Sequence, residues 1–521
     1  MIKTMSKPSS KLVKSAGSVG AFTLVSRILG VVRDAVIALL LGASPASDAF
    51  FVAFRIPNLL RKFFSDGMLT LSFVPVFTVY LTQKGRGQAF AMARSCFLLL
   101  SVTGVAIVVA GITFAPLVVR MVAPGFAPDS YTFALTVLLT RIMMPYLLCV
   151  SLMAVAMGVL NCLGHFAAPA AAPIVLNLAI LLMAHVFSPL VGSPALALAL
   201  GVVLGGIAQL ALQVPFLLQQ GFVFIKKAEM LHSGTLEVGQ KMLPSLVGAA
   251  GFQINVFVAT VMASTLSSGS ISYLYYAERL VQFPMALFAV SVSTVLLPEL
   301  SRAKDAKDPF AAPAVFTKAL GAVCFITIPA MVGLVALGEP LVSLLFHQGA
   351  FDLLCVRETA LALLCFCLGL WAFSGTRLLV TLFHGFGDVA TPFWAGLGAI
   401  GFNFVVGYIL GQTFGHWGLA LSISAAAAIN FFILLARASA YLDFVRVKNL
   451  SILACRSLFV SAIMYVPVSY GASLVTVELS KGAVLARVAG SVIVGIVVYV
   501  GTFLVIWGKG FQLVRGTIKR R

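Results

Sequence analysis

The chain has 521 residues, of which 61% are apolar and only 10% are charged, and its mean hydropathy is +1.07. A soluble globular protein of this length needs about a quarter of its residues charged, so the composition excludes that class. The net charge of +19 would suit a nucleic-acid partner, but the distribution of the basic residues along the chain explains it differently.

Apolar stretches of about 20 residues or more follow one another along the chain, separated by short polar breaks that contain Gly or Pro. Such stretches are long enough to cross the hydrocarbon core as helices, and they lack the alternation of β-barrel strands. We therefore predict an all-α polytopic membrane protein with about 14 transmembrane helices. In chain order, the expected spans cover residues 16–42, 48–82, 92–120, 131–160, 166–188, 194–220, 235–265, 271–301, 312–346, 355–384, 388–413, 416–438, 451–474 and 482–508.

Lys and Arg residues gather in alternate loops. Six segments that alternate with the expected spans hold most of the 35 basic residues, whereas the intervening loops hold only Arg120, Arg357 and Lys481. By the positive-inside rule, this bias predicts both termini on the cytoplasmic side and an even number of spans. The net charge is then a consequence of membrane topology, and no nucleic-acid partner is expected.

The chain resembles itself at a shift of about 223 residues. Each copy contains six expected spans, so both copies enter the membrane in the same direction and form two lobes that rock in alternating access. The matching segments are residues 73–75 with 296–298, 116–118 with 340–342, and 164–169 with 387–392. The predicted domains are an N-lobe at 1–222, a C-lobe at 223–440, and two C-terminal helices with a basic tail at 441–521.

Some basic residues fall inside or at the edges of the expected spans, where a charge costs about 2.5 to 3.5 kcal/mol. Four of them suit salt bridges or snorkelling near span ends, namely Arg55, Arg141, Arg377 and Arg487. The positive charges in the spans outnumber the acids available to neutralise them, so we predict that four other arginines line a water-filled cavity for an anion. Because the planar fork of arginine fits phosphate, the predicted substrate-binding residues are Arg27, Arg33, Arg61 and Arg279.

Other polar side chains accompany these arginines at helical spacing, so they are expected to support the site or to act in gating. In the first span, Arg27 and Asp34 share one line of the helix, and Ser26 and Arg33 share its neighbour. In the second span, one stripe holds Asn58, Arg61 and Ser65, and Lys62 lies four residues before Asp66, with which it can pair. In the eighth span, another stripe holds Tyr275, Arg279 and Gln282, beside Glu278.

The sequence shows no motif for metal binding, for ATP hydrolysis or for catalysis. The eight cysteines and six histidines are dispersed, so no metal site is predicted. The chain has no Gly-rich phosphate loop followed by Lys and Ser or Thr, which excludes a directly ATP-driven pump within it. No nucleophile with a neighbouring base stands out, so we predict that the protein is not an enzyme and has no cofactor.

Several motifs carry a family resemblance. They begin with Ser-Arg-Ile-Leu-Gly-Val-Val-Arg-Asp-Ala at 26–35 and Asp-Ala-Phe-Phe-Val-Ala-Phe-Arg-Ile-Pro-Asn-Leu-Leu-Arg at 48–61. On these motifs the chain resembles the MurJ/MviN family of lipid II flippases, in the multidrug/oligosaccharidyl-lipid/polysaccharide exporter superfamily. Further matches lie at 123–126, 161–177, 275–280, 296–298 and 418–422, so the resemblance covers nearly the whole chain.

The resemblance implies a V-shaped fold of two lobes in the bacterial cytoplasmic (inner) membrane, with a cationic cavity that receives lipid II, the undecaprenyl-pyrophosphate-linked disaccharide pentapeptide. It places the chain in peptidoglycan biosynthesis, cell wall biogenesis and cell shape, with membrane lipid and cell-wall synthesis proteins as further partners. The last two helices resemble those that form a groove for the lipid tail. In family members, the arginines required for function and thought to meet the pyrophosphate match Arg27, Arg33, Arg61 and Arg279.

The resemblance also assigns roles to two acids and shows two departures. Asp34 matches an acid thought to pair with an arginine in gating, and Asp48 matches another sensitive position. Lys62 stands where some members have a second arginine, so it keeps the charge without the bidentate geometry, and Glu278 stands where some have Asp.

Two questions stay open at the level of sequence. The first is the energy source, either the membrane potential or an ion gradient. Some family members hold a sodium ion in the second lobe, but the sequence does not identify such ligands here. The second is the substrate, since another lipid-linked oligosaccharide flippase and a multidrug/cation antiporter belong to the same superfamily. An organic-cation pump would need unpaired acids in its cavity, which disfavours the antiporter, and a membrane scaffold would not require buried arginines at all.

Overall fold

The computed structural model describes residues 10–64, 70–224, 229–230, 232–305, 311–438, 444–475 and 480–507. These residues are helical apart from short loops and one isolated bridge between Gln348 and Phe351. The chain divides into two compact units, Met1–Gln253 (the N-unit) and Ile254–Arg521 (the C-unit). The predicted all-α fold is confirmed, whereas the three domain boundaries given above stay predictions.

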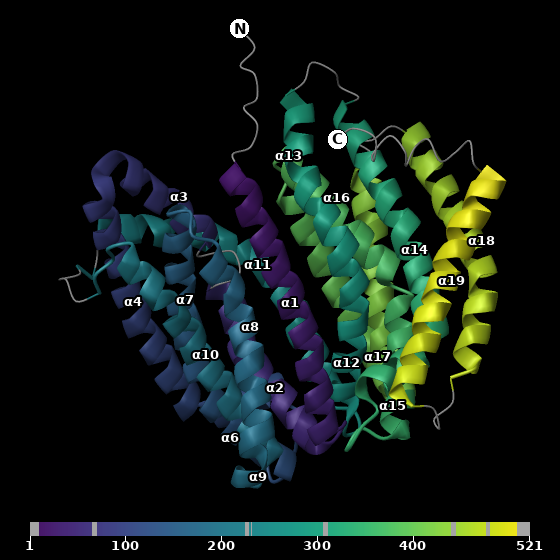
Figure 1. Cartoon of the computed structure of the whole chain (residues 1–521), viewed down its shortest axis with the longest axis horizontal. Helices are drawn as coiled ribbons and strands as arrows, with labels where there is room; N and C mark the ends of the chain where they lie inside the picture. The colour runs from purple at the N-terminus through teal and green to yellow at the C-terminus, as the bar shows by residue number, and fades with distance from the viewer. Residues whose placement is uncertain are drawn as a thin grey trace. The chain divides into compact units, whose positions relative to one another are not determined.

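The N-unit is a bundle in which α10 packs on α7 and α8, α8 packs on α1, and α7 packs on α4 (Figure 1). Many of its helices begin next to a proline, because a proline in the first turn needs no backbone hydrogen-bond partner. The helices are α1 (Ser10–Leu41), α2 (Pro45–Phe64), α3 (Thr70–Val79), α4 (Gly85–Thr113), α5 (Ala115–Val122), α6 (Tyr131–Met143), α7 (Pro145–Cys162), α8 (Ala167–Leu182), α9 (Ser188–Val191) and α10 (Pro194–Gln219), with π-helical turns η2 (Tyr80–Lys84) and η3 (Met183–Phe187).

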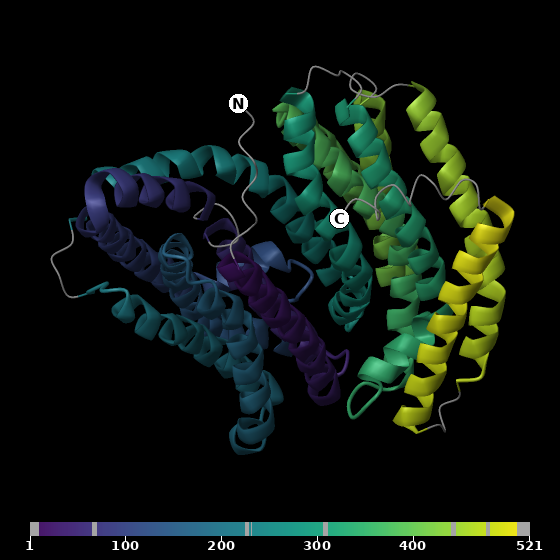
Figure 2. The same cartoon turned by 45° about the horizontal axis from the view of Figure 1, so that its top comes forward.

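Helix α11 (Ser233–Ser264) begins in the N-unit and ends in the C-unit. In the C-unit, α14 packs on α18 and α18 packs on α19, and these three lie side by side in both views (Figure 1, Figure 2). The remaining elements are α12 (Ser270–Pro284), the π-helical turn η4 (Met285–Val290), α13 (Ser291–Asp305), α14 (Ala311–Phe346), α15 (Leu353–Cys367), α16 (Leu370–Phe386), α17 (Ala390–Ala438), α18 (Phe444–Ser473) and α19 (Lys481–Trp507).

Much of the helical structure is apolar enough to cross a membrane. Within the described residues, nine helical segments meet the length and composition of a span, or ten if α15 and α16, bent by 44°, count as one. Large apolar side chains face outward on them, such as Val505 at 86% exposed. A lipid environment covers such surfaces, so the chain is a multi-pass membrane protein. The count of 14 spans stays a prediction.

Helix α17 explains part of the difference in the count. Its 49 residues would extend roughly 74 Å as one straight helix, far more than the hydrocarbon core needs. The backbone at Gly415 is non-helical, with φ 67° and ψ −147°, so α17 is two helices joined there. The sequence predicted this break, between the spans at 388–413 and 416–438.

The internal repeat also appears in the backbone. Gly164 and Gly387 are 223 residues apart, and they have φ values of 80° and 83°, a conformation that favours glycine. After each of these turns a new helix begins, α8 at Ala167 and α17 at Ala390, again 223 residues apart. The two copies therefore share a local structure at this corner and not only a sequence pattern.

Two helices of the C-unit begin at an aspartate cap. The carboxylate of Asp352 accepts a hydrogen bond from the backbone N–H of Cys355 at 2.8 Å, and that of Asp388 accepts one from Thr391 at 2.9 Å. These bonds favour the charged carboxylate, so they lower the pKa of Asp352 and of Asp388. The caps fix where α15 and α17 begin.

Each unit has its own apolar cores. In the N-unit, α3, α4 and the segment after α10 share one, built on aromatic residues that include Phe73, Phe90 and Phe222. In the C-unit, α18 and α19 pack on α14 through a separate core, where the Tyr499 hydroxyl donates to the Phe325 carbonyl at 2.9 Å. Because lipid tails are as apolar as these side chains, close packing rather than water exclusion stabilises these contacts.

At one position of α17 only glycine fits, because the backbone of the preceding half of the helix lies very close to it. A Cβ at Gly418 would overlap the carbonyl oxygen of Leu410 and lie 2.8 Å from its carbonyl carbon. We expect Gly418→Ala to destabilise the protein by about 1–3 kcal/mol, because the backbone must shift to relieve the overlap. Thermal unfolding of the purified protein in detergent measures this loss. Gly411→Ala is the control, since its Cβ would meet only Leu266, at 3.7 Å. Equal unfolding temperatures for both variants would contradict the expectation.

Candidate functional site

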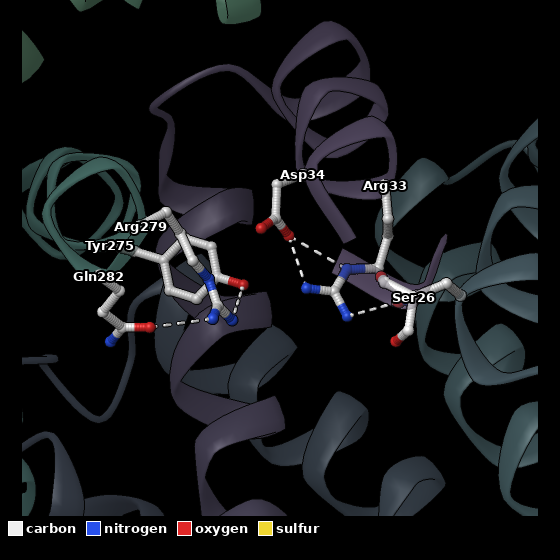
Figure 3. A network of polar contacts seen from close by, with 7 residues as sticks. Ser26, Arg33, Asp34, Tyr275, Arg279 and Gln282 are labelled. Carbon is white, nitrogen blue, oxygen red and sulfur yellow. Dashed lines mark hydrogen bonds and ion pairs between the residues drawn. The ribbon is translucent and has the colours of Figure 1, made fainter. Parts of the chain in front are cut away.

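Two buried charged residues of the N-unit are neighbours on α1. Arg33 is 8% exposed and Asp34 is 4% exposed. The Arg33 Nε and Nη2 atoms donate to the same carboxylate oxygen of Asp34, at 3.0 and 2.7 Å (Figure 3). Two opposite charges in contact lower the cost of placing either one in an apolar bundle. The pair is therefore a neutral unit inside α1.

A third residue ties this pair to another helix. The Arg33 Nη1 atom donates to the Asn177 side-chain oxygen at 3.0 Å, and the Asn177 amide donates to the Ser26 carbonyl at 3.1 Å. Asn177 belongs to α8 and is 5% exposed. The expected shared face of Ser26 and Arg33 is thus observed, with an amide of α8 bridging the two residues. Arg27, by contrast, is exposed and has no ion pair with another described residue.

Sequence reasoning did not select Asn177 as a site residue. Its signal is a single amide in the apolar run of α8, where an unpaired polar group would be costly. We expect Asn177→Ala to destabilise the protein by about 1–3 kcal/mol, because Arg33 loses an acceptor in a buried place. The unfolding temperature in detergent checks this. Asn161→Ala is the matched control, since the side chain of Asn161 is half-buried and makes no hydrogen bond with the described residues. A shift no larger than that of the control would refute the role.

The predicted residues of the second span lie on α2. The Arg61 Nε atom donates to the Asn58 side-chain oxygen at 3.1 Å, so the expected i, i+3 contact is present. Asp48 is in the first turn of α2 and is 3% exposed. The side chain of Lys62, and Ser65 and Asp66 entirely, lie outside the described residues. The predicted pairing of Lys62 with Asp66 therefore stays a prediction.

In the C-unit, the predicted stripe on α12 is a connected network. The Arg279 Nη2 atom donates to the Tyr275 hydroxyl at 2.8 Å, and Nη1 donates to the Gln282 oxygen at 3.5 Å (Figure 3). The guanidinium also lies 4.8 Å from the centre of the Tyr275 ring, within range of a cation–π contact. Glu278 accepts a hydrogen bond from the Gln282 amide at 2.6 Å. The network holds Arg279 half-buried in a fixed orientation.

Some arginines predicted to be structural make backbone contacts. The Arg141 Nε atom donates to the Ile112 carbonyl at 3.2 Å, and Arg487 donates to the Leu474 carbonyl. Such contacts satisfy the end of a neighbouring helix, whose last carbonyls lack partners within the helix.

The described residues contain no group of three His, Cys, Asp or Glu side chains that could hold a metal ion.

A buried amide and hydroxyl network joins α11 to both halves of α17. The Asn403 amide donates to the Asn255 oxygen at 3.3 Å, and the Ser422 hydroxyl donates to the Asn403 oxygen at 2.7 Å. These groups satisfy one another, so the network stabilises the packing of the C-unit.

Two helical units with apolar outer surfaces, and arginines held on α1, α2 and α12, define a multi-pass membrane protein. A family model described as lipid II flippase MurJ matches residues 37–490. A probable lipid II flippase MurJ of Vibrio cholerae serotype O1 is 35% identical over 435 residues, which cover 82% of this chain and 82% of the relative. The lipid II flippase MurJ of Burkholderia cenocepacia is 35% identical over 427 residues, which cover 81% of this chain and 83% of the relative. The chain belongs to the lipid II flippase MurJ family.

The fold agrees with this membership. A solved structure described as lipid II flippase MurJ in an inward closed conformation has a TM-score of 0.79 and 26% identity, and the match covers 94% of this chain and 99% of that one. An inward-facing multidrug resistance MATE transporter of the MOP superfamily has a TM-score of 0.69 at 14% identity, covering 82% and 98%, which shows a shared fold alone. The relatives are named as flippases, so the family is one of transporters and not of enzymes.

Proposed function

We propose that this protein moves lipid II from the cytoplasmic to the periplasmic leaflet. Its membership of the lipid II flippase MurJ family is the observation that carries the proposal. The substrate has an anionic pyrophosphate, a sugar–peptide headgroup and a long lipid tail. A protein that carries such a molecule needs cationic donors for the phosphates inside an otherwise apolar bundle.

The four arginines would then have different roles. Arg27 is exposed on α1 and has no described ion-pair partner, so its full charge is available to an anion. The Arg61 Nε atom donates to the Asn58 amide oxygen, and the Arg279 Nη2 atom donates to the Tyr275 hydroxyl, so neutral groups take part in orienting both guanidinium groups. The Arg33 guanidinium is paired with the carboxylate of Asp34, which neutralises it. We propose that Arg27, Arg61 and Arg279 meet the pyrophosphate, and that Arg33 and Asp34 position α1.

The parallel repeat supports a transport cycle by alternating access, in which the two lobes rock about the substrate. We propose that both termini are cytoplasmic, in agreement with the distribution of basic residues. Export of an anion is favoured by a membrane potential that is negative inside, by about 2.3 kcal/mol per charge for each 100 mV. The membrane potential is therefore the driving force we propose.

The test is the exposure of lipid II on the outer surface of cells that depend on this protein. An externally added hydrolase that cuts the headgroup reports how much lipid II has crossed. Depletion of the protein should abolish cleavage, and dissipating the membrane potential should reduce it. If cleavage continues unchanged after depletion, lipid II is not the substrate, and transport of another lipid-linked oligosaccharide or of an organic cation becomes the next hypothesis to measure.

A further inference from the structure

A second polar feature of the N-unit lies apart from the arginines assigned above. A cavity of about 420 Å³ opens between α4, α7 and α10. Among the described residues, its lining is mostly apolar and contains one charged residue, Arg94. The other lining residues are Phe97, Leu98, Ser101, Leu152, Leu210, Val214 and Phe224.

Among the described residues, Arg94 has no partner that would explain its position. It is half-buried on α4, and its Nε is buried without a hydrogen-bond acceptor among the described residues. No described acid forms an ion pair with it, and the Ser101 hydroxyl, which donates to the Phe97 carbonyl at 2.7 Å, accepts no hydrogen bond from Arg94. A buried donor on a charged group costs more than a neutral one when no acceptor meets it. The cavity therefore offers a cation to an anionic group.

The surroundings of the cavity identify the kind of anion. Arg94 and the next lining residues of α4 recur at i, i+3, i+4 and i+7, so they share one face of the helix. Below this face an exposed apolar stripe continues along α4, through Leu98, Val102, Val105 and Val109, which are 36 to 57% exposed. A soluble phosphate would use only the cation. A molecule with a phosphate and a hydrocarbon chain would use both the cation and the stripe.

We propose that this cavity binds an anionic phospholipid of the surrounding membrane, with its phosphate on Arg94 and an acyl chain along the apolar stripe of α4. The position of Arg94 suits this assignment. It is eight residues, or about 12 Å of helix, from Arg86 at the first turn of α4, on the side expected to be cytoplasmic. That depth corresponds to the boundary between lipid headgroups and chains.

The bound lipid would also support the segment that follows α10. Phe224 of that segment lines the cavity, and its ring packs against Phe97 of α4 and Phe222, with centroids 5.5 and 4.8 Å apart. A lipid in the cavity adds contacts to the same aromatic rings. It therefore stabilises the packing of the segment that follows α10 against α4.

The test measures binding of the purified full-length protein to phosphatidylglycerol, by native mass spectrometry and by the rise in unfolding temperature. Phosphatidylcholine and inorganic phosphate serve as comparison probes. We expect Arg94→Gln to weaken phosphatidylglycerol binding about tenfold, because one charged hydrogen-bonding group is lost. Arg94→Lys should retain most of the affinity, since it keeps the charge. Leu210→Trp should weaken binding while Arg94 is intact, because it fills the cavity.

Arg302→Gln is the matched control, since this arginine is exposed on α13. It should bind phosphatidylglycerol as the parent does. The proposal is overturned if Arg94→Gln and Arg302→Gln bind equally well. It is also overturned if inorganic phosphate stabilises the parent as much as phosphatidylglycerol does, because the ligand would then be a soluble anion. Binding is measured without transport, so its outcome is independent of the proposed lipid II activity.

Discussion

Cells that depend on an Arg279→Ala variant should expose at least about tenfold less lipid II to an external hydrolase than cells with the parent protein. The reason is that the Arg279 guanidinium donates to the Tyr275 hydroxyl and the Gln282 side-chain oxygen, which orient it for the phosphate of the proposed substrate. Loss of one charged donor to a phosphate corresponds to about 1.5–3 kcal/mol. The measurement is hydrolase cleavage at matched protein abundance in the membrane.

Two further variants separate charge from shape at this position. Arg279→Lys keeps the charge but loses the fork geometry and the guanidinium stacking on Tyr275, so it should recover only part of the exposure. Arg302→Ala removes an exposed arginine from α13 of the same unit and should leave exposure unchanged. Full exposure of lipid II with Arg279→Ala would sink the proposal that this arginine meets the pyrophosphate.

Asp34→Asn should be the most destabilising single change on α1. It leaves the Arg33 guanidinium buried without the carboxylate that now accepts two of its hydrogen bonds. Removing one member of a buried ion pair costs about 3–5 kcal/mol. The unfolding temperature in detergent should fall well below that of the parent. An unfolding temperature equal to that of the parent would show that the pair contributes nothing to stability.

The double variant Arg33→Met with Asp34→Leu tests the role of the pair. Replacing both partners of a buried ion pair with apolar side chains of similar size is often neutral for stability, so the double variant should unfold at a much higher temperature than Asp34→Asn, with the Asn177 oxygen left without its Arg33 donor. If the pair only positions α1, lipid II exposure should survive in part. A stable double variant with no exposure would instead assign Arg33 to the substrate.

The sequence determined much of this protein by itself. Long apolar runs are sufficient to predict membrane helices, because no other element satisfies its backbone within a single segment of lipid-exposed chain. Helical periodicity correctly placed Arg61 next to Asn58, and Arg279 next to Tyr275 and Gln282, because neighbours on one helix depend only on spacing. The break in α17 was also predictable, from the short polar interruption near Gly415.

Contacts between helices could only be decided by the tertiary structure. Periodicity identifies which residues share a face, but it does not specify which helix that face meets. It therefore gave no reason to join Asn177 of α8 to Arg33 and Ser26 of α1. It also placed Asp34 in line with Arg27, whereas the folded side chain turns to Arg33, its neighbour in the chain. The allowed rotamers and the surrounding packing determine this pairing, because a buried carboxylate must contact a guanidinium that lies within its reach.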